Sequence, residues 1–121
     1  MDRPRSECPI SFSLEVVGDP WSLLVIRDLV FFGKNTYNDF VASKEGMARN
    51  ILAERLNRLQ QMGILMAAPH PVDGRKKVYQ LTERGLELIP VLTDLVEWGA
   101  HNAPITNRNG GSMLYAVTAR A

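Results

Sequence analysis

Six basic side chains lie between residues 48 and 80, and only two acidic ones accompany them. This stretch carries a net charge of +4, whereas residues 81–102 carry −3 and the whole 121-residue chain only +1. Clustered Arg and Lys side chains bind phosphate groups and release counterions from nucleic acids. The near-neutral total excludes a uniformly basic nucleic-acid coating protein, but the local excess predicts a surface that binds double-stranded DNA.

The side-chain types in this stretch predict how such a surface reads DNA. Arg pairs with guanine and Asn with adenine through two hydrogen bonds each, so we expect Arg49 and Asn50 to contact base edges. Arg55 and Arg58 are expected to contact phosphate. The other predicted DNA contacts are Thr36, Ala53, Arg75, Lys76 and Lys77. Taken alone, a charged helix face or a basic turn is also typical of an ordinary solvated surface.

Cys8 is the only cysteine, which excludes an intramolecular disulfide and is typical of a reducing compartment. It directly precedes Pro9, a residue favoured in the first turn of a helix. The positive end of a helix favours the thiolate, which is the reactive form of a cysteine. Two interpretations stay open: a sensor of small electrophiles or oxidants, or a small apolar residue buried in a subunit interface.

Patterns typical of enzymes do not occur in this sequence. The two histidines, His70 and His101, are far apart, and there is no glycine-rich phosphate loop, nucleophile elbow or cluster of metal ligands. We therefore predict no enzyme activity, no cofactor and no bound metal. No apolar run reaches the roughly 18 residues of a membrane span, and no secretory signal is visible, so we expect a cytoplasmic, nucleoid-associated protein with no membrane partner.

Apolar spacing and cap residues predict the elements that must position these side chains. The predicted helices span 11–17, 20–32, 37–41, 48–62 and 83–101, and the predicted strands span 64–68 and 77–81. Arg27 and Asp28 are expected at a solvated or paired edge of an otherwise buried helix. Pro90 is expected to bend the last helix or to cost it a hydrogen bond.

A short helix, a tight turn, a long helix and a hairpin, in this order, predict a winged helix-turn-helix. The expected fold is mainly α with a small β-hairpin wing, an α+β arrangement in which the N- and C-terminal helices form a dimer interface. We assign residues 1–102 to this DNA-binding and dimerisation domain. Residues 103–121 form a predicted C-terminal tail.

The last predicted helix is apolar over more than one face, which favours a second copy of the chain as a partner. The predicted homodimer interface comprises Leu14, Leu86, Ile89, Leu92, Leu95, Val96 and Trp98. The alternative is a single wide face that packs on the core of its own chain.

Four stretches resemble the HxlR family of bacterial winged-helix regulators, relatives of the MarR group. They are Cys8 to Leu29, Asn50 to Leu59, Val78 to Gly85, and Ile89 to Leu92 with Trp98-Gly99. The resemblance implies a homodimeric transcription factor that binds an inverted-repeat operator through a recognition helix at about 48–62. For some members it implies sensing of electrophiles or oxidants through the cysteine that matches Cys8.

This chain departs from the family pattern at two positions. Ala48 and Ala53 stand where the family often has a small hydroxyl residue and a serine, respectively. The first departure weakens the cap of the recognition helix, and both remove side chains that can contact phosphate or bases.

The sequence therefore predicts a sequence-specific regulator of transcription that binds double-stranded DNA as a homodimer and responds to electrophiles or oxidants through Cys8. Two alternatives stay open: a winged-helix module that binds proteins, and a regulator that responds to a small ligand without thiol chemistry.

Overall fold

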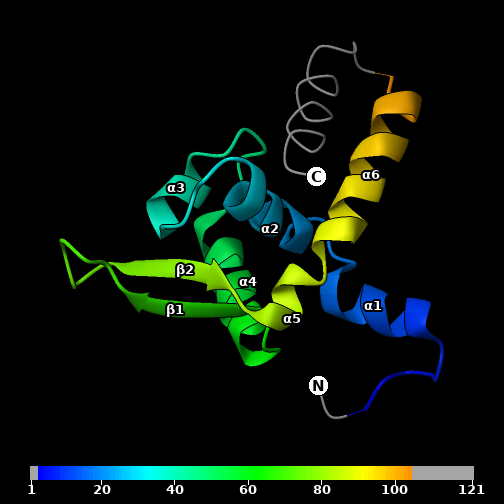
Figure 1. Ribbon diagram of the computed structural model, residues 1–121, viewed down its shortest axis with the longest axis horizontal. Helices are drawn as coiled ribbons and strands as arrows, with labels where there is room; N and C mark the ends of the chain where they lie inside the picture. Colours follow the sequence, from blue (N-terminus) through cyan, green and yellow to red (C-terminus); the bar gives the residue numbers. More distant parts are fainter. Residues whose placement is uncertain (1–2, 105–121) are drawn as a thin grey trace.

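In the computed structural model, which describes residues 3–104, the helices and strands follow the predicted order except that two helices replace the last predicted one (Figure 1). The elements are α1 (Pro9–Val17), α2 (Ser22–Phe31), α3 (Tyr37–Val41), α4 (Arg49–Gln61), β1 (Leu65–Pro69), β2 (Lys77–Leu81), α5 (Glu83–Leu86) and α6 (Ile89–Asn102). The predicted mainly helical winged fold is thus confirmed. The predicted tail lies outside the described residues, apart from its first two positions.

The core lies where α2, α3 and α4 meet each other and the hairpin. α4 packs on α3 and β1, while α2 packs on β2 and α6. Leu52, Leu56 and Leu59 are almost fully buried, because spacings of four and three residues place them on one side of α4. Burying one such leucine contributes roughly 1.5–3 kcal/mol, so this stripe fixes α4 to the body of the molecule.

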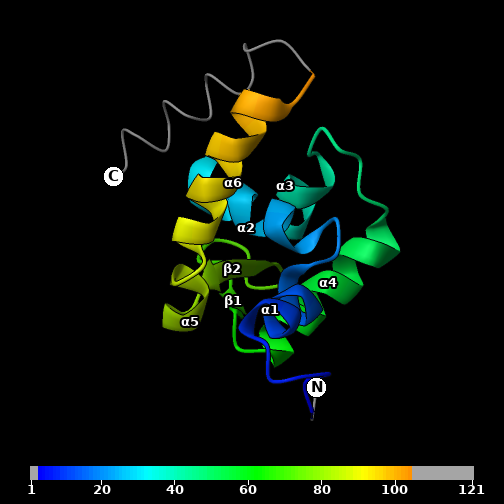
Figure 2. The ribbon, with the colours of Figure 1, turned by 90° about the vertical axis from the view of Figure 1, so that its right-hand side faces the viewer.

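The hairpin projects from one side of the molecule, and α1 and α6 lie on the opposite side (Figure 1). The view in Figure 2 faces the side formed by α1, α5 and α6. β1 and β2 pair antiparallel, with Ala67 opposite Tyr79. The backbone N–H of Tyr79 donates to the carbonyl oxygen of Asn35 at 2.8 Å, which ties the hairpin to the connection between α2 and α3.

The predicted cap of α3 is present in full. The hydroxyl of Thr36 accepts a hydrogen bond from the backbone N–H of Asp39, and the Asp39 carboxylate accepts one from the backbone N–H of Thr36. A five-residue helix is marginal by itself, so this reciprocal cap and the burial of Phe40 define where α3 forms.

The prediction of one continuous helix from residue 83 to residue 101 is wrong. The chain forms the short helix α5, turns at Glu87 and Leu88, and starts again as α6. Pro90 lies in the first turn of α6, where a backbone N–H has no partner within the helix. The missing N–H of Pro90 therefore costs no hydrogen bond, and Pro90 helps to begin α6 instead of bending it. Gly85 allows α5 to approach the hairpin closely, because a Cβ there would overlap the carbonyl oxygen of Ile64.

Arg27 and Asp28 form a paired edge, as predicted, but one that is shielded from solvent. Asp28 is 2% exposed and accepts hydrogen bonds from Arg27, at 2.8 and 3.0 Å, and from the hydroxyl of Ser43. Arg27 also binds Glu45 at 2.7 Å. These contacts join α2 to the connection between α3 and α4.

Within residues 3–104, no single helix is long and apolar enough to cross a membrane. Taken together, α1 and α2 satisfy the same length and composition test only as a pair with a 77° bend between them.

Candidate nucleic-acid interface

The exposed side of α4 presents the predicted base-reading residues. Arg49, Asn50 and Ala53 are exposed, and so is Asn57 one turn further along. A helix of 13 residues is about 20 Å long, and its diameter of roughly 10–12 Å fits the width of a DNA major groove. Because the opposite side of α4 is held in the core, these side chains face away from the body of the protein.

The first turn of α4 has an anchor that the sequence did not reveal. The phenolic hydroxyl of Tyr37, on α3, donates to the backbone carbonyl oxygen of Arg49 at 3.1 Å. The bond crosses 12 residues, so no local pattern predicts it. The N-cap residue Ala48 makes no side-chain cap, as expected for a position without a hydroxyl.

Arg55 and Arg58 point toward the start of the chain rather than away from the protein. The Nε atom of Arg55 lies 2.9 Å from a carboxylate oxygen of Asp19, and Arg55 also pairs with its neighbour Glu54. Arg58 donates to the backbone carbonyl oxygen of Glu15 and lies 3.9 Å from Asp19. Both arginines therefore have partners within the chain, and their contact with phosphate stays a prediction.

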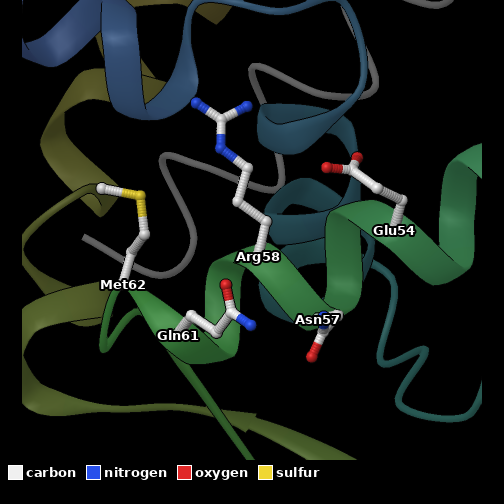
Figure 3. Close-up of a pocket in the computed structure, with 5 residues that line it drawn as sticks. All are labelled: Glu54, Asn57, Arg58, Gln61 and Met62. Atoms are coloured by element: carbon white, nitrogen blue, oxygen red, sulfur yellow. The ribbon is translucent and has the colours of Figure 1, made fainter. Parts of the chain in front are cut away.

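Figure 3 shows Arg58 extending away from Asn57 and Gln61, toward the α1–α2 side of the molecule. The same residues, with Glu54 and Met62, line a polar pocket of about 330 Å³. All of them belong to α4 or to its C-terminal cap, so the pocket is a feature of the surface of this helix.

Asp19 is the acceptor that organises this region. Its carboxylate accepts from the backbone N–H groups of Trp21 and Ser22, at 3.0 Å each, and from the hydroxyl of Ser22 at 2.6 Å. Burial by itself would raise the pKa of Asp19, but the hydrogen bonds from Ser22, Arg55 and the backbone outweigh it and lower the pKa to about 2. Asp19 thus holds the start of α2, which begins at Ser22 rather than at the predicted residue 20, and also holds α4.

The wing presents cations at its tip. Arg75, Lys76 and Lys77 are all exposed. Arg75 lies 3.1 Å from the Asp73 carboxylate, and its hydrogen bonds lower the pKa of Asp73. Within residues 3–104 no ion pair involves Lys76 or Lys77, so the wing retains positive charge for an anionic partner.

Thr36 and Cys8 lie at helix starts, where the sequence places them. The hydroxyl of Thr36 serves the cap of α3, and its contact with DNA stays a prediction. Cys8 is the N-cap residue of α1, and its side chain is exposed in the single chain. The thiol is therefore accessible unless a second subunit covers it.

The predicted dimer residues divide into two groups. Leu92 is 5% exposed, and Val96 packs against the core. These two side chains therefore pack on the core of their own chain, which is the alternative to a place in a dimer interface. The large side chains on α1, α5 and α6 that remain exposed are Ile10, Leu14, Leu86, Val91, Leu95 and Trp98. Ile10 and Val91 were not among the predicted residues. Ile89 is partly buried.

The short helix α3, the longer helix α4 that packs on it and the basic β1–β2 hairpin define a winged helix-turn-helix protein. Residues 16–107 match the family model described as HxlR-like helix-turn-helix, and the chain belongs to this family.

The chain is 34% identical over 92 residues to MT3179 of Mycobacterium tuberculosis, an uncharacterized HTH-type transcriptional regulator. The match covers 76% of this chain and 57% of that protein, so the chain spans little more than half the length of this relative. The crystal structure of PA1607 superposes with a TM-score of 0.78 at 34% identity, over 89% of this chain and 74% of that one. The oxidized form of the redox regulator HypR superposes with a TM-score of 0.71 at 28% identity, over 81% of this chain and all of that one.

Replacing Asp19 with asparagine is expected to lower the free energy of unfolding by about 1–2 kcal/mol at neutral pH, because Arg55 loses its ionic partner and the start of α2 loses a charged cap. The folded-state pKa of Asp19 lies below its unfolded value of 3.8, so its stabilising contribution is present above pH 4 and is lost as the pH falls toward 2. Urea unfolding at several pH values measures this. The two proteins should differ at pH 6 and converge near pH 2, and a pH-independent difference would contradict the role of the charge.

Proposed function

We propose that this protein is a regulator of transcription that binds double-stranded DNA in a sequence-specific manner, as a homodimer on an inverted repeat. The observation that carries the proposal is the exposed first turn of α4, where Arg49 and Asn50 stand on a helix whose other side is locked in the core. The positive wing supplies sequence-independent attraction to phosphate. Family membership and the names of the relatives support the same reading.

The proposed division of labour assigns base reading to α4 and phosphate binding to the wing. Replacing Arg49 or Asn50 with alanine is expected to weaken binding to a selected duplex by about ten-fold or more, because each bidentate contact is worth about 1–3 kcal/mol. Replacing Lys76 and Lys77 together is expected to weaken binding to all duplexes alike and to reduce the salt dependence by roughly two phosphate contacts. Fluorescence anisotropy at several salt concentrations, on duplexes recovered from a random pool, measures both.

The matched control is Arg84→Ala, which removes an exposed arginine from α5. It should leave binding unchanged, and all variants should melt near the wild-type temperature because the replaced side chains are exposed. If Arg49→Ala and Asn50→Ala bind selected DNA as tightly as the wild type, α4 is not the reading helix. If the wild type binds no duplex, the chain acts in another way, such as binding a protein.

We propose that the exposed apolar side chains of α1, α5 and α6 form the seam of the homodimer. Leu14, Leu95 and Trp98 are 57%, 49% and 68% exposed, which is costly for large apolar groups gathered on one side of a molecule. A two-fold dimer places its recognition helices about one duplex turn apart, roughly 34 Å, which suits an inverted repeat.

Light scattering is expected to give a mass twice that of the 13.5 kDa chain at micromolar concentration, and Leu95→Glu is expected to give the monomer mass, because a buried unpaired charge opposes the contact. Val72→Glu is the control, since Val72 is 90% exposed at the far end of the hairpin, and it should remain dimeric. A wild-type monomer under these conditions would exclude the inverted-repeat mode.

We propose further that Cys8 makes DNA binding sensitive to electrophiles or oxidants. The support is its exposure at the start of α1, beside the proposed seam, together with the similarity to HypR, which is named a redox regulator. With one cysteine per chain, the available products are an adduct, a sulfenic acid, or a disulfide with the partner subunit or a small thiol.

Diamide or a quinone is expected to change the affinity of the wild type for DNA, whereas Cys8→Ser should bind DNA and ignore both agents, because it lacks the thiolate nucleophile. Binding assays before and after treatment, with mass spectrometry of the product, measure this. If the wild-type affinity does not change although Cys8 is modified, the thiol has no regulatory role.

A further inference from the structure

Two arginines of the recognition helix bind the junction between α1 and α2. Arg55 and Arg58 are three residues apart, so their side chains leave α4 on the same side. Arg55 binds the carboxylate of Asp19 at 2.9 Å, and Arg58 binds the backbone carbonyl oxygen of Glu15. We name these four residues the junction clamp.

The junction that receives the clamp has little freedom to move. The backbone N–H of Gly18 donates to the carbonyl oxygen of Leu14 at 2.8 Å, and a Cβ at Gly18 would overlap this carbonyl group. On the other side of Gly18, Asp19 accepts three hydrogen bonds from the start of α2. The clamp therefore connects α4 directly to the end of α1 and to the junction that follows it.

The clamp joins the two ends of the proposed dimeric DNA reader. α1 carries Ile10 and Leu14, which belong to the exposed apolar surface, and α4 carries the base-reading residues Arg49 and Asn50. In the proposed dimer, the distance between the two-fold axis and the first turn of α4 thus depends on the position of α4 relative to α1. One base pair of additional spacing moves a half-site by about 3.4 Å and rotates it by about 35°, so small changes in this geometry select between operators.

We infer that Arg55 and Arg58 are positioning residues that set the half-site spacing accepted by the dimer, an inference that rests on the proposed dimeric DNA binding. Their guanidinium groups hold two acceptors at once, which the single ammonium group of lysine does not reproduce. Arg55→Lys and Arg58→Lys therefore loosen the clamp and keep the net charge, so non-specific attraction to DNA stays the same.

The test uses a series of duplexes with inverted copies of the half-site that the wild type selects, separated by zero to about ten base pairs. The wild type is expected to prefer one spacing. In each lysine variant, the ratio of affinities between the best and the next spacing should fall at least three-fold, or the optimum should move by one base pair. Affinity for a single half-site should stay within two-fold, and Arg84→Lys should reproduce the wild-type profile.

Parallel loss of affinity on all spacings would overturn the inference, because fewer folded molecules or a lost phosphate contact act equally on every duplex. An unchanged profile in folded variants, checked by circular dichroism, would also overturn it. If a lysine variant does not fold, the spacing profile of Asp19→Glu replaces it as the test. This variant keeps the negative charge and shifts the acceptor by one methylene, so the same change in spacing preference is expected. If the wild type binds no duplex at all, the proposed function itself is refuted. The binding measurement on the wild type separates this outcome from a failure of the inference about the clamp.

Discussion

The carboxylate of Asp19 joins the start of α2 to α4 at the junction that follows α1. It follows α1, accepts the first hydrogen bonds of α2 and receives Arg55 from α4. A largely shielded carboxylate is stabilising only when donors surround it, and here four hydrogen bonds outweigh the cost of burial. The hydrophobic stripe of α4 fixes which side of the helix faces the core, but the Asp19 contacts fix its direction against the N-terminal part of the chain.

Charge is distributed according to the use made of each surface. The hairpin loop and the outer side of α4 hold exposed cations, while residues 81–102, which include α5 and α6, carry a net charge of −3 next to exposed apolar side chains. The negative charge on α5 and α6 repels a duplex, and the exposed apolar side chains there favour contact with another protein surface. The near-neutral total therefore conceals a molecule with two ends of different chemistry.

The sequence predicts much of the fold because its signals are local. The pair Thr36 and Asp39 and the leucine stripe of α4 each lie within one to three helical turns, and the structure has both. It predicts less of the site, because side-chain partners lie far away in the chain. Arg55 is 36 residues from Asp19, and no local pattern reveals this contact. From the sequence alone, an arginine off the apolar stripe of α4 is therefore predicted to bind phosphate. Likewise, the close approach of Gly85 to the carbonyl oxygen of Ile64 joins residues that lie far apart in the chain.

The inward orientation of Arg55 and Arg58 affects which contacts α4 would contribute to DNA binding. Of the three arginines on α4, only Arg49, which we assign to base reading, has no side-chain partner among the described contacts. Each missing phosphate contact lowers the affinity for random sequence and leaves base-specific hydrogen bonds untouched. In the proposed DNA complex, α4 would therefore contribute few phosphate contacts, so its share of the affinity would come mainly from base contacts and would depend little on salt.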